Sequence, residues 1–483
     1  MITQKSIKKD VIHKRYVLGV HPIINFYIKK LNLPDILSSY LPYDARMNLT
    51  HDTVLTVLIH NILTEQSPLY EIPDWIKPVD PEHLNLESGN IDRFNDDRIG
   101  RSLSVFFQSK HKEIFFRLAL RAIKLFNIDC QQIHQDTTTV TFHGTYSAWP
   151  YSPVLKHGIN KYHRPDLKQL VLGMSVTADG SVPLVHNIYD GNQTDDRVHL
   201  ENHRRLRKLL QRSDFIYVAD CKLATETNLG KINALGGLFV SVMPKTWQES
   251  AEFFNKVKNK TIKWEFLLKK KNSRKPDSEE VIYDLAKGIY TTKQGYRLLW
   301  IKSSQKAQLD SEKREKNIDK SLNGLKSIQA KLNKYSLKTE KNIEKKIQEL
   351  LERYDCMALI KYQINTEEEK YRKFNKAGRP GTDTKGKIML KKYYTLSFEM
   401  NIENIVKDSL TDGVFPLITN LAEKYSPSKI LNIYKYQPFL EKRHSQIKTY
   451  QKIAPVYLKS PERVIAYLHI HVMSLMVATL IER

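Results

Sequence analysis

The sequence predicts an α/β protein in which helices flank a mixed sheet, with a helical region before the sheet and a large α+β insertion within it. Before residue 126, apolar residues recur mainly at helical spacing in segments broken by prolines. From residue 131 the pattern changes to alternating, β-branched runs. The elements then follow as strand, two-stranded hairpin, helix, strand, helix and strand, an order that implies helices packed on a mixed sheet.

The N-terminal region, 1–125, is expected to form a small helical domain. Its third predicted helix keeps helical spacing through Val54, Leu55, Leu58 and Ile62. The segment contains no clear recognition-helix signature, so a DNA-binding bundle and a purely structural bundle remain alternatives.

Three segments predict the first part of the core, 126–245. QIHQDTTTVTFHG reads as a strand, QLVLGMSVTADGSVPLVHNIY as a hairpin, and DFIYVAD as a short buried strand. Residues 246–424 read as the insertion, in which 306–354 form a solvated helix or helical hairpin between two probable strands, GYRLLWIKSS and KKYYTLSFEMN. Residues 425–483 are expected to return to the core as helices.

The charge balance favours polyanionic partners. Lys and Arg number 77 against 53 Asp and Glu, giving a formal net charge of +24. The three cysteines stand far apart, which indicates a reducing cytoplasm and no disulfide framework. Residues 464–481 carry no formal charge, but they include two histidines, so a buried core helix is favoured over a membrane span.

Two aspartates occupy positions typical of a metal-dependent site. Asp136 lies within the first strand among threonines, and Asp220 ends the buried strand DFIYVAD. If these strands are adjacent, both carboxylates can converge and bind Mg²⁺, which prefers oxygen ligands. Two such ions about 3.5–4 Å apart can activate an attacking oxygen and stabilise a leaving one in phosphoryl transfer. The alternative is that each aspartate caps the following element.

A third carboxylate is expected from the C-terminal region. Glu441 is the only acidic residue between Glu423 and Glu462. Tyr434, Glu441 and Lys448 are spaced by seven residues, so on one continuous helix they share a face. This arrangement suits a metal ligand flanked by phosphate contacts. Pro438 suggests that a helix begins there, and the alternative for Glu441 is a surface glutamate paired with a lysine.

These residues resemble the DDE transposases of bacterial insertion sequences, in the group whose last acidic residue lies in a Tyr-x2-Arg-x3-Glu-x6-Lys signature. Here the signature reads Tyr434-x2-Gln437-x3-Glu441-x6-Lys448, with glutamine in place of arginine. The resemblance spans nearly the whole chain and is weakest from 250 to 400. Its further motifs are HQDTTTVTFHG, GINKYHRPDLKQLVLGMSV, YDGNQTDD, VADCKLATETNL and, in the N-terminal region, GVHPIINFYIKKLNL to FNDDRIGRSL.

The resemblance implies an RNase H-like core in which Asp136, Asp220 and Glu441 hold two Mg²⁺ or Mn²⁺ ions. It implies cut-and-paste movement of an element with terminal inverted repeats, on double-stranded DNA, by a homodimer. It further implies a cytoplasmic, nucleoid-associated bacterial protein without a membrane partner, whose N-terminal domain binds the DNA ends. Glutamine at 437 implies the loss of one phosphate contact, and many relatives continue beyond the position of Arg483.

Further phosphate contacts are expected from a polar loop before the hairpin. Lys161, Arg164 and Lys168 cluster there, although a solvated basic loop fits equally well. Tyr434 and Lys448 are expected to contact DNA beside Glu441. Two other classes of protein remain open: an RNase H-like nuclease without strand transfer, and a non-catalytic DNA-binding protein derived from a transposon.

Overall fold

The computed structural model describes residues 14–143, 146, 153–158, 164–194, 197–271, 280–373, 387–453 and 458–483. The chain divides into two compact units. Unit 1 comprises Met1–Pro244 and Ile418–Arg483, and unit 2 comprises Lys245–Leu417. The fold is mixed α/β, with a mixed sheet flanked by helices, as the sequence pattern predicts.

Unit 1 begins with short helices whose starts follow from local sequence. Pro22, Pro34 and Pro73 each lie in the first turn of a helix. A backbone N–H at that position has no acceptor within the helix, so proline costs no helical hydrogen bond there. Asn95 caps the fifth helix by accepting from Arg98 N at 2.7 Å. The elements are α1 (His21–Lys30), α2 (Leu33–Ser38), α3 (His51–Leu63), α4 (Ile72–Ile76), η1 (Pro81–Leu84), η2 (Ser88–Arg93), α5 (Asp96–Gln108) and α6 (His111–Phe126).

The sheet of unit 1 is built around β1 (Gln132–Phe142). One neighbour is β3 (Lys168–Thr177), which pairs antiparallel with β1 and, on its other edge, with β4 (Pro183–Tyr189) and the short β2 (Lys156–His157). The other neighbour is β5 (Ile216–Val218), which is parallel to β1 and to β6 (Leu238–Val242). The order is therefore β4-β3-β1-β5-β6, with the predicted β3–β4 hairpin in place.

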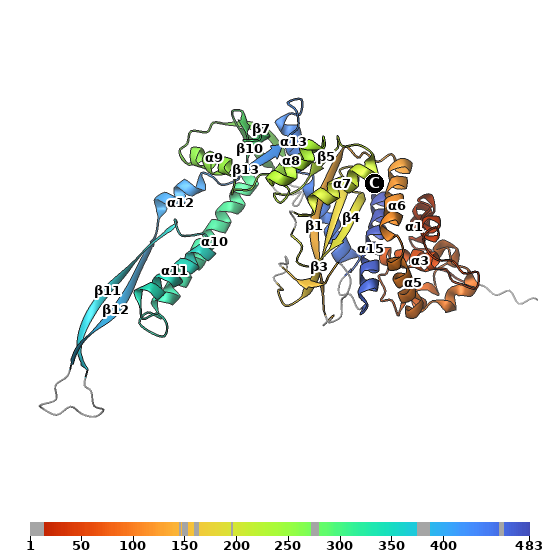
Figure 1. Cartoon of the computed structure of the whole chain (residues 1–483), viewed down its shortest axis with the longest axis horizontal. Coiled ribbons are helices and arrows are strands. Elements are labelled where there is room, and N and C mark those ends of the chain that lie inside the picture. Colours follow the sequence, from red (N-terminus) through yellow and green to blue (C-terminus); the bar gives the residue numbers. More distant parts are fainter. Residues whose placement is uncertain are drawn as a thin grey trace, which may run out of the picture. The chain divides into compact units, whose positions relative to one another are not determined.

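Helices cover this sheet. In the chain, α7 (His199–Leu210) connects β4 to β5, and α8 (Glu226–Ala234) connects β5 to β6. The apolar segment near the C-terminus forms α15 (Pro461–Glu482), which packs against α3, α5 and β4 and lies between the sheet and the N-terminal helices (Figure 1). It is the one helix among the described residues that is long and apolar enough to cross a membrane, but 83% of its apolar window is buried in the protein. That burial favours the core-helix interpretation.

The chain returns to unit 1 near the end of β13 (Val414–Thr419). Thr419 Oγ1 donates to Phe239 O of β6 at 2.6 Å, which ties the returning chain to the sheet. Three short helical segments follow before α15: α13 (Pro427–Tyr434), α14 (Gln437–Ser445) and the π-helical turn η4 (Gln446–Tyr450).

Unit 2 combines short strands, a helical hairpin and a long two-stranded ribbon. The strands β7 (Trp264–Lys270), β8 (Val281–Ala286), β9 (Tyr290–Thr291) and β10 (Arg297–Ser303) pair antiparallel, and α9 (Gln248–Lys258) accompanies them. The Lys/Glu-rich stretch folds as the hairpin of α10 (Ser304–Gln329) and α11 (Glu340–Arg353). The ribbon is β11 (Ile360–Lys373) with β12 (Lys387–Met400), and α12 (Ile402–Ser409) follows it.

Candidate active site

Asp136 lies within β1, and Asp220 lies just beyond the end of β5, the adjacent parallel strand. The last aligned pair of β1 and β5 is His134 with Val218. Asp136 lies two residues beyond His134, and Asp220 lies two residues beyond Val218. Since side chains two residues apart along a strand point to the same face, the register directs both carboxylates to one place on the sheet.

Asp220 also serves the turn that follows β5. Its Oδ1 accepts from the backbone N–H of Lys222 at 3.0 Å, and its backbone carbonyl accepts from Ser241 Oγ at 2.7 Å. Asp220 therefore closes this turn, whereas the helix-capping role considered from sequence falls to Thr225, which caps α8. The contact with Lys222 fixes the position of this aspartate and is compatible with a ligand role for the other carboxylate oxygen.

The helix α14 packs on the same face through Gln437. Its Oε1 lies 2.8 Å from His134 Nδ1, and its Nε2 donates to the backbone carbonyl of Gln135 at 3.1 Å. Glu441 lies one helical turn beyond Gln437, and Asp136 lies two residues beyond His134. Glu441 on α14 and Asp136 on β1 therefore each lie close to the contact between Gln437 and His134.

Two further contacts hold this helical segment on the β3–β4 turn. Ser181 Oγ and the Tyr436 hydroxyl are 2.7 Å apart. The buried Arg443 donates to Gly180 O at 2.9 Å and forms an ion pair with Glu482 at 2.5 Å. Both ends of α14 are thus anchored to the core of unit 1, which restricts where Glu441 can lie.

Asp136 and Glu441 line one open groove of ≈ 310 Å³. The other lining residues are Thr138, His444, Ser445, Lys448 and Thr449. His444 Nε2 lies 3.9 Å from Asp136 Oδ2, at the edge of ion-pair range. The groove therefore brings two carboxylates and a lysine ammonium to one accessible surface, with the buried imidazole of His444 beside Asp136.

Tyr434 connects Asp220 to the same cluster. Burial raises the pKa of the Tyr434 hydroxyl, and the charges of Asp220, Cys221, Glu441 and Asp136 raise it further. All three predicted carboxylates therefore act electrostatically on one phenol. A phenolate there would be disfavoured, so Tyr434 remains a neutral hydroxyl able to donate a hydrogen bond.

The expectation of one continuous helix through Tyr434, Glu441 and Lys448 is wrong. Tyr434 ends α13, a break follows at Lys435 and Tyr436, and Lys448 lies in the π-helical turn η4. The break precedes Pro438, which lies in the first turn of α14 as the proline suggested. Glu441 and Lys448 nevertheless line the same groove.

Gln437, which stands where the resembled signature has arginine, is bonded to β1. Gln437 is only 9% exposed, and both of its polar atoms bond to β1. Its partner His134 is fully buried, and that burial lowers the pKa of the imidazole to about 4, against the opposing effect of the Gln437 hydrogen bond. An arginine at this position would place a cation beside a neutral, buried histidine.

A second groove, of ≈ 350 Å³, adjoins the first at Lys448. Arg164 and His143 also line it. Arg164 forms a bidentate ion pair with Asp166, at 2.8 and 2.6 Å, while Lys168 Nζ donates to Tyr146 O at 3.4 Å. The predicted Lys161 lies outside the described residues, so the structure places Arg164 and Lys448 together but not the whole predicted cluster.

No group of three or more His, Cys, Asp or Glu side chains is close enough to hold a metal ion within the part of the chain that the structure describes. Asp136 and Glu441 share the groove, whereas Asp220 is linked to them through Tyr434. The three carboxylates thus form no closed metal-binding cluster among the described residues.

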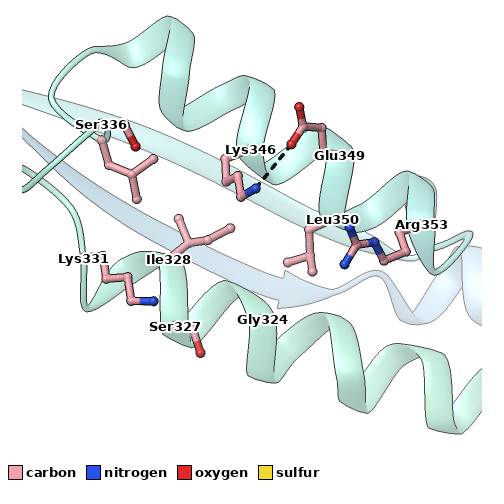
Figure 2. Close-up of a pocket in the computed structure, with 10 residues that line it drawn as sticks. Gly324, Ser327, Ile328, Lys331, Ser336, Lys346, Glu349, Leu350 and Arg353 are labelled. Carbon is pink, nitrogen blue, oxygen red and sulfur yellow. Dashed lines mark hydrogen bonds and ion pairs between the residues drawn. The ribbon is translucent and has the colours of Figure 1, made fainter. Parts of the chain in front are cut away.

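A hollow in unit 2 has a different chemical character. It measures ≈ 320 Å³ and lies between α10 and α11, where Gly324 allows Leu350 to approach closely (Figure 2). Its only carboxylate, Glu349, pairs with Lys346 at 3.4 Å (Figure 2). This hollow carries no paired carboxylates and is not the candidate active site.

Sequence reasoning missed His134, His444 and the bonding role of Gln437. His444 could have been found, because it lies one helical turn beyond Glu441 and therefore shares its side of the helix. His134 carries a weaker signal, an alternating strand position two residues before Asp136. The Gln437 contact joins residues 303 positions apart, and nothing local in the sequence indicates it.

Comparisons with known proteins cover parts of the chain. Residues 14–120 match a family described as a domain of unknown function, DUF4277. No curated protein matches. One similar solved structure is the cryo-EM structure of a piggyBac transposase synaptic complex with hairpin DNA, at 11% identity and a TM-score of 0.31. That match covers 58% of this chain and 60% of the other.

Proposed function

We propose that this chain is a DNA transposase of the DDE class, which cleaves DNA at the ends of a mobile element and joins the freed 3′-hydroxyl to target DNA. The observation that carries the proposal is the placement of Asp136 on β1 and of Asp220 just after the adjacent parallel strand β5, with Glu441 lining the same groove as Asp136. The strand order β4-β3-β1-β5-β6, with β5 and β6 parallel to β1, supports an RNase H-like core.

The chemistry of the donor atoms, rather than their spacing, suits Mg²⁺ or Mn²⁺. Carboxylate oxygens are the ligands that these ions prefer, and the groove beside Asp136 and Glu441 is open to solvent and substrate. Asp136, Asp220 and Glu441 would hold the ions. When bound, the ions would supply activation of the attacking oxygen and stabilisation of the leaving oxygen.

The protein residues would position the reacting DNA strand. In the first step a water oxygen bonds to phosphorus and the 3′-oxygen leaves as a hydroxyl. In the second step that hydroxyl bonds to a target phosphorus, and the target's own 3′-oxygen leaves. Lys448, between the two grooves, and Arg164, in the second, would contact phosphates on either side of the scissile bond. Tyr434 would donate a hydrogen bond within the carboxylate cluster.

The remaining assignments belong to this proposal. Double-stranded DNA, comprising the terminal inverted repeats and the target, would be the partner, bound by a homodimer that pairs two ends. The N-terminal helices would bind the DNA end, and residues 245–417 would form an insertion within the catalytic core. The protein would act in the bacterial cytoplasm at the nucleoid.

The test is cleavage and joining of labelled DNA that carries the element's own ends, with Mg²⁺. We expect wild type to cut and join, and Asp136→Ala, Asp220→Ala and Glu441→Ala to bind DNA without doing either. Glu423→Gln, which removes an exposed carboxylate outside the groove, is the matched control and should behave as wild type. Mn²⁺ binding, followed by electron paramagnetic resonance, should weaken in the three alanine variants only.

The other outcomes separate the alternatives. Cleavage without a joined product would identify a nuclease without strand transfer. DNA binding that is unaffected by Mg²⁺ and by all three substitutions, with no cleavage, would identify a non-catalytic DNA-binding protein and overturn the proposal.

A further inference from the structure

The ribbon of β11 and β12 extends beyond the helices that it covers. Its antiparallel register places Ile364 opposite Leu396 and Thr366 opposite Tyr394. Leu396 and Tyr394 are buried in the core formed with α10 and α11, and Ile364 packs against that core. Figure 1 shows both strands continuing past the end of the helical hairpin. Near its base the ribbon therefore packs against α10 and α11, and near its end it extends beyond these two helices.

The same face of the ribbon changes character along its length. After Tyr394 comes an ion pair between Glu368 and Lys392, at 3.4 Å. The next two pairs on this face are Lys370 opposite Leu390 and Arg372 opposite Ile388. Each pair joins one cation to one aliphatic side chain, because cross-strand partners point to the same side of a ribbon.

The apolar side chains at this end are exposed. Ile388 is 65% exposed and Leu390 is 55% exposed, while Met389 and Tyr371, opposite each other on the other face, are each 40% exposed. Single exposed apolar residues are ordinary, but Ile388 and Leu390 are neighbours on one face of the ribbon. A contiguous exposed apolar patch indicates a surface that a partner covers.

The ribbon is mainly basic around the patch, with Glu368 and Glu369 standing opposite Lys392 and Lys391 at its inner edge. In the described residues 370–373 and 387–392, six side chains are basic and none is acidic. Lys391 makes a cation–π contact with Tyr393, with its ammonium 4.6 Å from the ring centroid, and Lys392 pairs with Glu368. The other four, which have no carboxylate partner among the described residues, are Lys370, Arg372, Lys373 and Lys387.

We propose that this end of the ribbon inserts into a groove of duplex DNA, with Ile388 and Leu390 against the base edges and Lys370 and Arg372 reaching phosphates. A two-stranded β-ribbon fits the major groove, and aliphatic side chains can contact thymine methyl groups there. Apolar side chains in the minor groove instead separate base steps. Duplex DNA matches both the positive charge and the apolar patch.

A second copy of this chain fits the surface less well. Apposition of two ribbon ends would bring two sets of unpaired cations together, and like charges facing each other are destabilising. A polyanion gains from the same charges, because each phosphate contact releases counterions. This inference shares with the proposed function only the premise that DNA is the partner, and it requires no catalysis.

The test measures binding of the full-length chain to a fluorescent duplex of mixed sequence, in EDTA, over a range of salt concentrations. For Lys370→Gln with Arg372→Gln, we expect weaker binding and a slope of log affinity against log salt smaller by about 1–2. For Ile388→Ser with Leu390→Ser, we expect weaker binding with an unchanged slope. Lys341→Gln with Lys345→Gln, which removes two exposed charges from α11, is the matched control and should bind as wild type.

Thermal unfolding of every variant should match wild type, because all of the substituted side chains at the ribbon end are exposed. The proposal fails if both ribbon variants bind like the control, or if wild type binds no duplex. It also fails if the ribbon variants alter only the mass in sedimentation, which would identify a self-association arm. Asp136→Ala, which tests the catalytic proposal, should retain the ribbon-dependent binding, so the two failures are distinguishable.

Discussion

Gln437 joins α14 to β1 by two hydrogen bonds, one with His134 Nδ1 at 2.8 Å and one to Gln135 O at 3.1 Å. On the other side of the imidazole, Gln132 Nε2 lies 2.7 Å from His134 Nε2. The network assigns the proton to Nδ1, since Gln132 Nε2 is a donor and Gln437 Oε1 an acceptor. A chain of polar contacts thus fixes the helix that carries Glu441 on the strand that carries Asp136.

Replacement of this glutamine should therefore affect catalysis more than DNA binding. Gln437→Leu leaves His134 Nδ1 and the Gln135 carbonyl without partners in a buried place, which costs roughly 1–3 kcal/mol of unfolding free energy. We expect a lower melting temperature and a cleavage rate reduced by at least tenfold, with DNA affinity unchanged. Lys442→Gln, an exposed neighbour on α14, should leave the melting temperature unchanged. A Gln437→Leu enzyme of normal rate would show that the contact does not position Glu441.

Removal of the Tyr434 hydroxyl should change the acid side of the pH–rate profile. Tyr434→Phe removes a buried hydroxyl that lies within electrostatic reach of Asp136, Asp220 and Glu441. The carboxylates should then protonate more readily, so the acid limb of cleavage should move to higher pH and the rate should fall about tenfold or more. Tyr450→Phe, at a position 68% exposed, is the control. An unchanged acid limb would place the hydroxyl outside the functional cluster.

The fold of unit 1 could be predicted from local patterns, because its strands and helices carry distinct periodicities. The β-branched run from Thr137 to Thr141 gives β1, and the turn before Ser181 gives the β3–β4 hairpin. Asp136 and Asp220 could be singled out because local sequence patterns predict the strands in or next to which they lie. Their common level in the sheet depends on the parallel pairing of β1 with β5, a non-local contact.

The surroundings of Glu441 were less predictable. The seven-residue spacing of Tyr434, Glu441 and Lys448 predicts a shared face only on an unbroken helix. The helix is instead interrupted before Gln437 and adopts a π-helical turn after Ser445. Both departures depend on tertiary anchors, Tyr436 on Ser181 and Arg443 on Gly180. The ribbon at β11 and β12 shows the same limit: its sequence predicted only the second strand.

Arg443 should prove important for the stability of this region. Its guanidinium is buried and bonds to both Gly180 O and Glu482, so Arg443→Ala removes two anchors of α14. Loss of one partner from a buried ion pair costs about 3–5 kcal/mol, a range that the partial exposure of Glu482 should reduce. We expect a lower urea midpoint for Arg443→Ala and a smaller decrease for Glu482→Gln. Equal midpoints for wild type and Arg443→Ala would show that the ion pair does not anchor the helix.

Buried histidines should make the protein sensitive to mild acid. Burial lowers the pKa of His134 and His203 to about 4 and of His60 to about 3. Burial also holds the pKa values of His186 and His469 well below the ordinary value. The two rings share a hydrogen bond of 2.5 Å between His186 Nε2 and His469 Nδ1. As pH falls below 6.5, the unfolded chain takes up protons that the folded chain does not, so stability decreases until the folded-state pKa values are reached.

Each such histidine can contribute up to about 1.4 kcal/mol of lost stability per pH unit within that window. We therefore expect the urea midpoint to fall steeply between pH 6.5 and pH 4. His469→Gln keeps a polar side chain without a titrating ring, so it should lower stability at pH 7.5 but reduce the steepness of the acid decrease. His157→Gln, at an exposed position, should leave the steepness unchanged. If His469→Gln retains the full wild-type steepness, the pair of His186 and His469 does not contribute to acid unfolding.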